Sequence, residues 1–206
     1  MFATGASSPD AKVPDMTQTP EIQPATDATM LRHGMLPGHE AINSRLRPML
    51  LEMAARIPDK GTNKAAGESY FSNKWLSARD LHRRTDPAMA SLVGLVEQAA
   101  NRTAWPNAGP GQRRITAMWA IVSRKGLEGR PHKHSGVISG AYYVEAGDCD
   151  EAGNGGFAIY APESDEVLGT VRPKTGLLLM FPNTLWHGVL RYDSENPRIV
   201  ISFNLS

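Results

Sequence analysis

The sequence predicts a mainly β protein, a sandwich or barrel of short strands, with α-helices packed on it from the N-terminal half. Two observations predict this class. After Pro110-Gly111, short runs rich in β-branched and aromatic residues are separated by clusters of Gly, Pro, Asn and Asp. Such runs are typical of sandwiches and barrels rather than of alternating βαβ units. Before that point, apolar side chains recur at helical spacing.

The first expected helix covers residues 39–57, where apolar side chains recur every three or four positions. Pro48 lies inside this run and predicts a kink or a break at Arg47, because proline cannot donate the helical hydrogen bond. The composition of residues 58–61 predicts a turn, and residues 62–69 are expected to form a loop.

The second expected helix begins at Asp86-Pro87, with the aspartate as N-cap and the proline at the first helical position. Its apolar face contains Leu92, Leu95, Val96 and Ala99. We expect both helices to cover one side of a sheet. The strands of the β region are expected at residues 114–122, 137–144, 156–160, 177–181 and 198–204.

The chain is expected to form one domain behind an N-terminal arm. Residues 1–29 are rich in Ala, Ser, Thr, Pro and Asp and contain few large apolar groups, which predicts a flexible arm. Residues 30–206 are expected to be a single domain. Within it, residues 39–105 provide helical support and residues 112–206 form the β core.

Composition restricts the classes of function. The 206 residues are 41% hydrophobic and 21% charged, as in soluble globular proteins. The formal net charge is +1 and no basic block occurs, so we expect neither nucleic acid nor a membrane surface as partner. The sequence has no signal-peptide pattern and no stretch approaching ~20 apolar residues. With a single cysteine, Cys149, these features predict a cytoplasmic protein.

Three of the six histidines stand out. In an extended segment, His132 and His134 point to the same face, which suits two adjacent ligands of one metal ion, although such pairs also occur by chance on exposed strands. His187 follows an apolar run that predicts a buried strand. It is therefore either a residue at the mouth of a barrel or a core histidine bonded to a carbonyl. The other histidines, His33, His39 and His82, are expected to be surface side chains.

Arg198 opens the last expected strand, and its alternate neighbours Val200, Ser202 and Asn204 should share its face. An arginine that points into a barrel needs a partner, because burying an unpaired charge is very costly. A carboxylate ligand held through two hydrogen bonds would be a natural partner. The alternative is a surface arginine paired with Asp193 or Glu195.

Four segments together resemble one family. They are residues 130–134 (Arg-Pro-His-Lys-His), residues 139–144 (Ser-Gly-Ala-Tyr-Tyr-Val), residues 176–188 and residues 198–204. In this order they resemble the 2-oxoglutarate–Fe(II) oxygenase superfamily, and within it a bacterial and phage group with a histidine-rich proximal motif. The resemblance covers roughly the C-terminal half, and residues 75–95 resemble the upstream helices of the same group.

The resemblance implies a double-stranded β-helix, a barrel of the jelly-roll or cupin type, that uses Fe(II) and 2-oxoglutarate. It implies that His132 and His187 are the proximal and distal iron ligands. It also implies that Arg198 holds the distal carboxylate of 2-oxoglutarate, supported by Tyr143. The implied activity is hydroxylation, in which decarboxylation of 2-oxoglutarate to succinate is coupled to oxidation of a C–H bond.

The sequence departs from the superfamily pattern where a carboxylate ligand is expected, because His134 occupies that position. Three histidines could bind iron and leave a formal charge of +2, which dianionic 2-oxoglutarate would neutralise. Alternatively, His134 only supports the site and Glu145 or Asp148 completes it. Val200 also replaces the serine of the usual Arg-x-Ser pair, so Ser202 or Asn204 is expected to compensate as a contact of 2-oxoglutarate.

Two other functions compete with this interpretation. One is a cupin-like enzyme that binds metal through three histidines and does not use 2-oxoglutarate. The other is a non-catalytic module that binds a metal or a small ligand. The substrate could be a small molecule or a peptide, and the sequence does not define an oligomeric state. Several side chains could line a substrate pocket or hold an acidic substrate, although such residues more often lie in cores or on surfaces: Trp119, Trp186, Arg114, Arg130 and Arg172.

Overall fold

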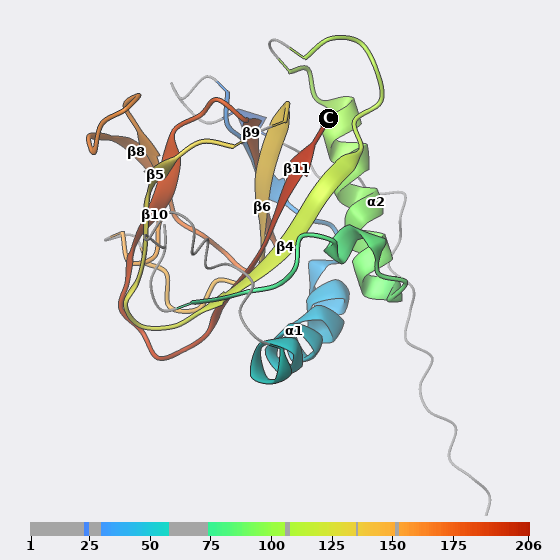
Figure 1. The fold of residues 1–206 in the computed structure, drawn as a ribbon, viewed down its shortest axis with the longest axis vertical. Helices are drawn as coiled ribbons and strands as arrows, with labels where there is room; N and C mark the ends of the chain where they lie inside the picture. The colour runs from blue at the N-terminus through green and yellow to red at the C-terminus, as the bar shows by residue number, and fades with distance from the viewer. Residues whose placement is uncertain (1–22, 25–29, 58–73, 106–107, 135, 151–152) are drawn as a thin grey trace, which may run out of the picture.

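The computed structural model describes residues 23–24, 30–57, 74–105, 108–134, 136–150 and 153–206. Within these residues, the strands form two antiparallel sheets that face each other, one of seven strands and one of four. The helices pack on the outer face of the larger sheet, and the smaller sheet lies on its opposite side (Figure 1). The prediction of a mainly β protein with N-terminal supporting helices is confirmed.

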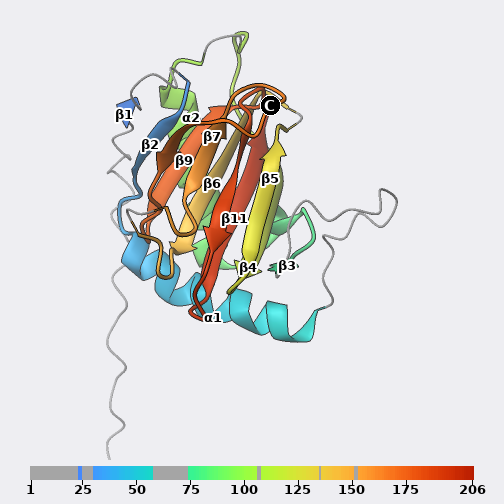
Figure 2. The ribbon, with the colours of Figure 1, turned by 90° about the vertical axis from the view of Figure 1, so that its left-hand side faces the viewer.

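The larger sheet has the strand order β1-β2-β9-β6-β11-β4-β3. Its strands are β1 (Gln23–Pro24), β2 (Arg32–Met35), β3 (Lys74–Leu76), β4 (Ile115–Ser123), β6 (Ile138–Glu145), β9 (Leu177–Pro182) and β11 (Arg198–Leu205). The smaller sheet, which faces the viewer in Figure 2, has the order β5-β10-β7-β8. Its strands are β5 (Leu127–His132), β7 (Phe157–Tyr160), β8 (Val167–Val171) and β10 (His187–Tyr192).

The first helix, α1 (His39–Arg56), runs through Pro48 without a break, so the expected break at Arg47 is wrong. In a regular helix the residue at position 48 would donate its N–H to the carbonyl of Ser44. Both Ser44 and Pro48 are exposed. Water can therefore bond the freed carbonyl, while the buried Leu46 and Leu50 keep the helix on the sheet.

The second helix, α2 (Pro87–Arg102), starts as predicted. The Asp86 Oδ1 accepts hydrogen bonds from the backbone N–H groups of Ala88 and Met89, at 3.0 and 3.2 Å. These bonds satisfy two of the donors that a helix leaves free at its first turn. A short 3₁₀ turn, η2 (Leu81–Arg83), precedes it. None of the described helices is both long and apolar enough to cross a bilayer.

The central strands β6 and β11 present two different faces. Towards the helices, alternate residues pack with α1 and α2 in the main apolar core; they include Tyr142, Val144, Ile199, Ile201 and Phe203. Towards the smaller sheet, the intervening residues join a second apolar cluster; they include Ala141, Tyr143 and Val200. Side chains of the last strand therefore alternate between the two faces, as expected. One set packs in the apolar core beneath the helices, and the other faces the space between the sheets.

All five predicted strands are present, with ends that differ by one residue or fewer from the prediction. Strands β1, β2, β3, β5, β8 and β10 were not predicted. In the expected arm, Gln23 and Pro24 pair with β2, and the other residues up to position 29 lie outside the described part. The turn expected at residues 58–61 and the loop at residues 62–69 also lie outside it.

Candidate metal centre

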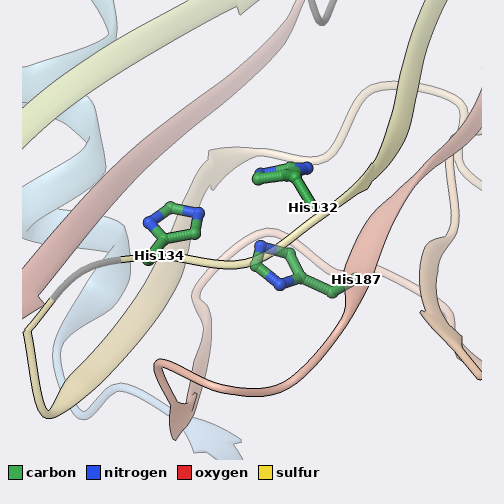
Figure 3. Close-up of side chains that lie close together, drawn as sticks. All are labelled: His132, His134 and His187. Atoms are coloured by element: carbon green, nitrogen blue, oxygen red, sulfur yellow. The ribbon is translucent and has the colours of Figure 1, made fainter. Parts of the chain in front are cut away.

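The three histidines singled out from the sequence lie together at one end of the smaller sheet (Figure 3). Their ring centroids are 4.5 Å apart for His132 and His187, 4.9 Å for His134 and His187, and 5.1 Å for His132 and His134. One nitrogen from each ring lies within 4.8 Å of the corresponding nitrogens of the other two. Among the histidine, cysteine, aspartate and glutamate side chains of the described residues, these three histidines form the cluster that could hold a metal ion.

Strand pairing brings the three residues together. His132 ends β5 and His187 begins β10, and the two are direct partners across this antiparallel pair. His134 lies beyond the end of β5, where its backbone N–H donates to the carbonyl of Asn183 at 3.0 Å. The histidine pair therefore converges as the sequence predicted. Because β10 was not predicted, its pairing with β5 could not be used to bring His187 to the pair.

Hydrogen bonds fix the tautomer of each ring. The Nδ1 of His132 lies 2.9 Å from the carbonyl of Arg130, and that of His187 lies 2.9 Å from the carbonyl of Leu185. Since a carbonyl only accepts, each Nδ1 carries the proton. The Nδ1 of His134 bonds to the Asn204 Oδ1 at 3.1 Å. The Nε2 lone pairs are therefore the ones available to a metal.

Burial keeps all three rings neutral. It lowers the pKa of His132 below the usual value and, together with repulsion from His132, lowers the pKa of His134 to about 4. For His187, burial and the two neighbouring histidines lower the pKa well below the usual range. A neutral imidazole can bind a metal without first losing a proton. The three neutral rings can therefore bind a metal cation directly.

Aromatic rings and one polar pair hold the histidines in place. The ring of His187 stacks on Phe157 with centroids 5.3 Å apart and meets Phe181 at 4.5 Å. The Oδ1 of Asn204, which bonds His134, also accepts from the Ser139 hydroxyl at 3.0 Å. Asn204 was predicted as a contact of 2-oxoglutarate. The structure gives it a bond to a candidate ligand, and its role towards the diacid stays a prediction.

The histidines open into a cavity of about 600 Å³ between the two sheets. Arg198, Val200, Ser202 and Asn204 line it together, as the strand period predicted. Trp119 and Trp186 also line it, whereas the arginines at positions 114, 130 and 172 are not among its lining residues.

Arg198 is a buried cation in this cavity, with only 2% of its surface exposed. Its guanidinium lies 3.4 Å from the Tyr143 hydroxyl and contacts the Cys149 thiol, and its Nε has no hydrogen-bond partner among the described residues. Burial raises the pKa of Tyr143 to about 12 and also raises the pKa of Cys149, so both neighbours are neutral. No described carboxylate forms an ion pair with Arg198. The alternative of a surface arginine paired with Asp193 or Glu195 is therefore wrong.

Several solved structures share this fold. HygX from Streptomyces hygroscopicus, solved with nickel and 2-oxoglutarate bound, is 12% identical with a TM-score of 0.58, over 84% of this chain and 82% of HygX. A Pseudomonas putida prolyl-4-hydroxylase is 17% identical with a TM-score of 0.59, over 86% and 94% of the two chains. A Trichoplax adhaerens prolyl hydroxylase in complex with a hypoxia-inducible-factor peptide is 15% identical with a TM-score of 0.58, over 80% and 78%. The predicted double-stranded β-helix is confirmed.

The sequence matches a protein family as well. No curated protein sequence matches the chain. The model of a family described as putative 2OG-Fe(II) oxygenase matches residues 117–204, a stretch that contains every residue predicted to bind the metal or 2-oxoglutarate. This match, which covers less than half of the chain, and the shared fold together place the chain in the 2-oxoglutarate–Fe(II) oxygenase superfamily. The resemblance read from the four motifs is confirmed.

His134 occupies the position where the resemblance implies a carboxylate ligand, and no described carboxylate lines the cavity in its place. Glu145 bonds Arg47 at 2.7 Å. Asp148 accepts hydrogen bonds from Ser194 and Asn196 in an exposed loop. Neither lines the cavity. The alternative in which one of them completes the metal site is therefore wrong.

The donor set fits the groups that the superfamily uses. Three neutral imidazoles suit a divalent transition metal such as Fe(II) and leave other coordination positions open. Arg198, which has no ion pair with a described carboxylate, suits a carboxylate ligand, because guanidinium binds carboxylate through two parallel hydrogen bonds. A metal and a diacid could thus occupy one cavity.

Six further residues lie where the sequence did not predict them. The half-buried His33, His39 and His82 are not the surface side chains that we expected, although none of them joins the metal cluster. Three cationic residues line the cavity that the sequence did not single out as site residues: Lys74, Arg79 and Lys133. Lys74 and Arg79 come from β3 and the segment after it, where the short strand gave no periodic signal.

Proposed function

We propose that the protein is an Fe(II)- and 2-oxoglutarate-dependent oxygenase, a hydroxylase that couples decarboxylation of 2-oxoglutarate to oxidation of a substrate C–H bond. The proposal depends on the burial of Arg198. Arg198 is a buried cation without a carboxylate partner among the described residues, in the same cavity as three neutral histidines. Such a charge is costly unless a ligand anion pairs with it.

The metal would be held by His132, His134 and His187 through their Nε2 atoms. The hydrogen bonds at Nδ1 fix the orientation of each ring before the metal binds, which favours affinity. Because all three ligands are neutral, the two charges of the metal match the two charges of 2-oxoglutarate. Iron and 2-oxoglutarate together supply, with oxygen, an oxidant that can attack a C–H bond.

The far carboxylate of 2-oxoglutarate would be held by Arg198. Tyr143, which stays protonated at physiological pH, can donate its hydroxyl to the same carboxylate. Ser202 and Asn204 lie on the same strand face, and we propose Ser202 as a further donor. HygX, which shares the fold, was solved with 2-oxoglutarate bound, and this supports 2-oxoglutarate as the diacid.

The proposal extends to the organisation of the protein. Residues 30–206 would act as the oxygenase domain and residues 1–29 as an arm outside it. We propose a cytoplasmic location, in keeping with a single cysteine, Cys149, which is buried and unpaired.

A spectroscopic titration tests the proposal. Fe(II) and 2-oxoglutarate are added without oxygen, and the weak visible charge-transfer band of the chelate is recorded. Oxygen is then admitted and succinate is measured, including turnover without substrate. We expect wild type and the exposed-surface control Arg45→Gln to give the band and succinate. Arg198→Gln should bind iron but require much more 2-oxoglutarate.

Other outcomes distinguish the competing functions. Iron binding with no spectral response to 2-oxoglutarate would favour the cupin-like enzyme that binds metal through three histidines. A protein with no affinity for Fe(II) or for other divalent transition metals would leave only a module that binds a small ligand.

A further inference from the structure

Positive charge gathers at the mouth of the cavity, beside the histidines. Besides Arg198, the lining residues include three cations: Lys74, Arg79 and Lys133. None of the described residues that line the cavity is acidic. The whole chain has a net charge of only +1, so this clustering is local.

Arg79 is held in a defined position. Its carbonyl accepts a hydrogen bond from the N–H of Met118 at 3.0 Å, which ties the segment after β3 to β4. Its guanidinium lies 4.4 Å from the ring centroid of Trp119, a distance typical of a cation–π contact. No described carboxylate lies within 4.0 Å of it, and its neighbour Asp80 does not line the cavity. Among the described residues, packing on Trp119 positions Arg79, and no acidic partner does.

Trp119 connects Arg79 to the metal centre. Its ring stacks on His134 with centroids 5.8 Å apart. Burial is the main cause of the low pKa of His134, and the positive charge of Arg79 lowers it further. Arg79 thus lies close to the histidines, on the side of the cavity formed by β4.

Lys133 provides a second cation between the two proximal histidines. Its ammonium lies 5.4 Å from the ring centroid of Trp186. The side chain is exposed and forms no ion pair with any described residue. Lys74, on β3, adds to the positive potential, since its charge contributes to the lowered pKa of His132 after the larger effect of burial.

The proposed metal and 2-oxoglutarate would not neutralise the charges of Arg79 and Lys133. Dianionic 2-oxoglutarate would balance the two charges of a metal held by neutral imidazoles, with one carboxylate on the metal and the other on Arg198. Arg79 and Lys133 then face the remaining space, in which no described lining residue is negatively charged. A cavity of about 600 Å³ is within the range of small-molecule sites.

We propose that the substrate is a small organic anion, bearing a carboxylate or phosphate group that Arg79 and Lys133 hold beside the iron. The indole rings of Trp119 and Trp186, which lie next to these cations, would contact its carbon skeleton. Arg79 suits this role because guanidinium binds carboxylate and phosphate through two parallel hydrogen bonds. The inference rests on the proposed function and names the substrate class of the same site.

Paired probes test the charge preference. The full chain, loaded anaerobically with Fe(II) and 2-oxoglutarate, is titrated with phenyl phosphate or phenol, and with hexanoate or hexanamide. Binding is followed by calorimetry and by the shift of the chelate band. We expect each anion to bind at least about tenfold more tightly than its neutral partner, which corresponds to about 1.4 kcal/mol. Added salt should reduce the difference.

Variants assign the preference to residues. Arg79→Gln, and Arg79→Gln combined with Lys133→Gln, should lose most of the preference while the chelate band with 2-oxoglutarate persists. Arg79→Lys, which keeps the charge, should retain part of it. Arg45→Gln on α1, on the opposite side of the larger sheet, should behave as wild type.

Three outcomes would count against the inference. Equal binding of the acidic and neutral probes by wild type would overturn it, and so would an unchanged preference in the double variant. A wild-type protein that gives no chelate band would refute the proposed function itself, and the inference would fall with it. The band and the probe titrations therefore separate the two failures.

Discussion

The two faces of β11 differ in what they do with buried groups. On the helix side, Ile199, Ile201, Phe203 and Leu205 are fully buried in apolar contacts. On the cavity side, the same strand buries Arg198 and Asn204 and points Ser202 into the space between the sheets. One face contributes stability through burial of apolar surface. The other keeps polar groups ready for ligands, at a cost in stability.

This difference makes the two faces separable by mutation. Substitutions on the helix face should lower the stability of the fold and leave the ligand affinity of the folded protein unchanged. Substitutions on the cavity face should do the reverse.

Phe203→Ala should give the largest loss of stability. Phe203 is fully buried between α-helices and sheet, and truncation of such a ring leaves a cavity. The expected loss in the free energy of unfolding is about 3–5 kcal/mol. Urea denaturation followed by circular dichroism measures it, and metal affinity under native conditions should stay within about twofold of wild type. A variant that is fully stable but cannot bind metal would contradict the separation.

His187→Ala should give the largest loss of metal affinity. Loss of a residue that merely supports a ligand costs about 10–100-fold in affinity, so loss of a ligand should cost more than about 100-fold. Calorimetric titration with Ni(II) or Fe(II) measures this. His33→Ala, outside the metal cluster, is the matched control and should bind one metal ion as wild type does. Equal affinity in the two variants would exclude His187 as a ligand.

The pH dependence of stability should show that the histidines are buried in neutral form. In the unfolded chain these side chains take up protons near pH 6.5, whereas folded His134 does so only near pH 4. Below pH 6.5 the unfolded state therefore binds more protons. The free energy of unfolding of the metal-free protein should be highest above pH 6.5 and fall as the pH decreases towards 4.

Chemical denaturation at a series of pH values, with a chelator present, measures this slope. His134→Gln should show a shallower decrease, since it removes one of the groups responsible. Stability that rises on acidification across this interval would contradict the assignment of neutral buried rings.

Features that depend only on neighbouring residues could be predicted from the sequence. Alternation along residues 198–204 identified the face of Arg198, because side chains of a strand alternate whatever the strand pairs with. The His-x-His spacing predicted convergence for a similar local reason. The Asp86-Pro87 helix start was also found, since capping involves only neighbouring residues.

Features that depend on distant segments could not be predicted. Lys74 and Arg79 reach the cavity only because β3 pairs with β4, and a strand of three residues has no readable period. Asn204 bonds His134 across 70 positions of sequence. The continuous helix through Pro48 depends on solvent around Ser44, which the apolar pattern does not report.

The central claim is that Arg198 is a buried cation whose anion comes from a ligand. The test is urea denaturation of wild type and Arg198→Leu, each measured metal-free, with Fe(II) alone, and with Fe(II) plus 2-oxoglutarate under anaerobic conditions. The metal-free variant should be more stable than metal-free wild type by about 1–3 kcal/mol, because an unsatisfied buried group is removed. 2-Oxoglutarate at about 100 times its dissociation constant should stabilise Fe(II)-loaded wild type by about 2.7 kcal/mol and leave the Fe(II)-loaded variant unchanged. A variant that is less stable than wild type and is still stabilised by 2-oxoglutarate would contradict the claim.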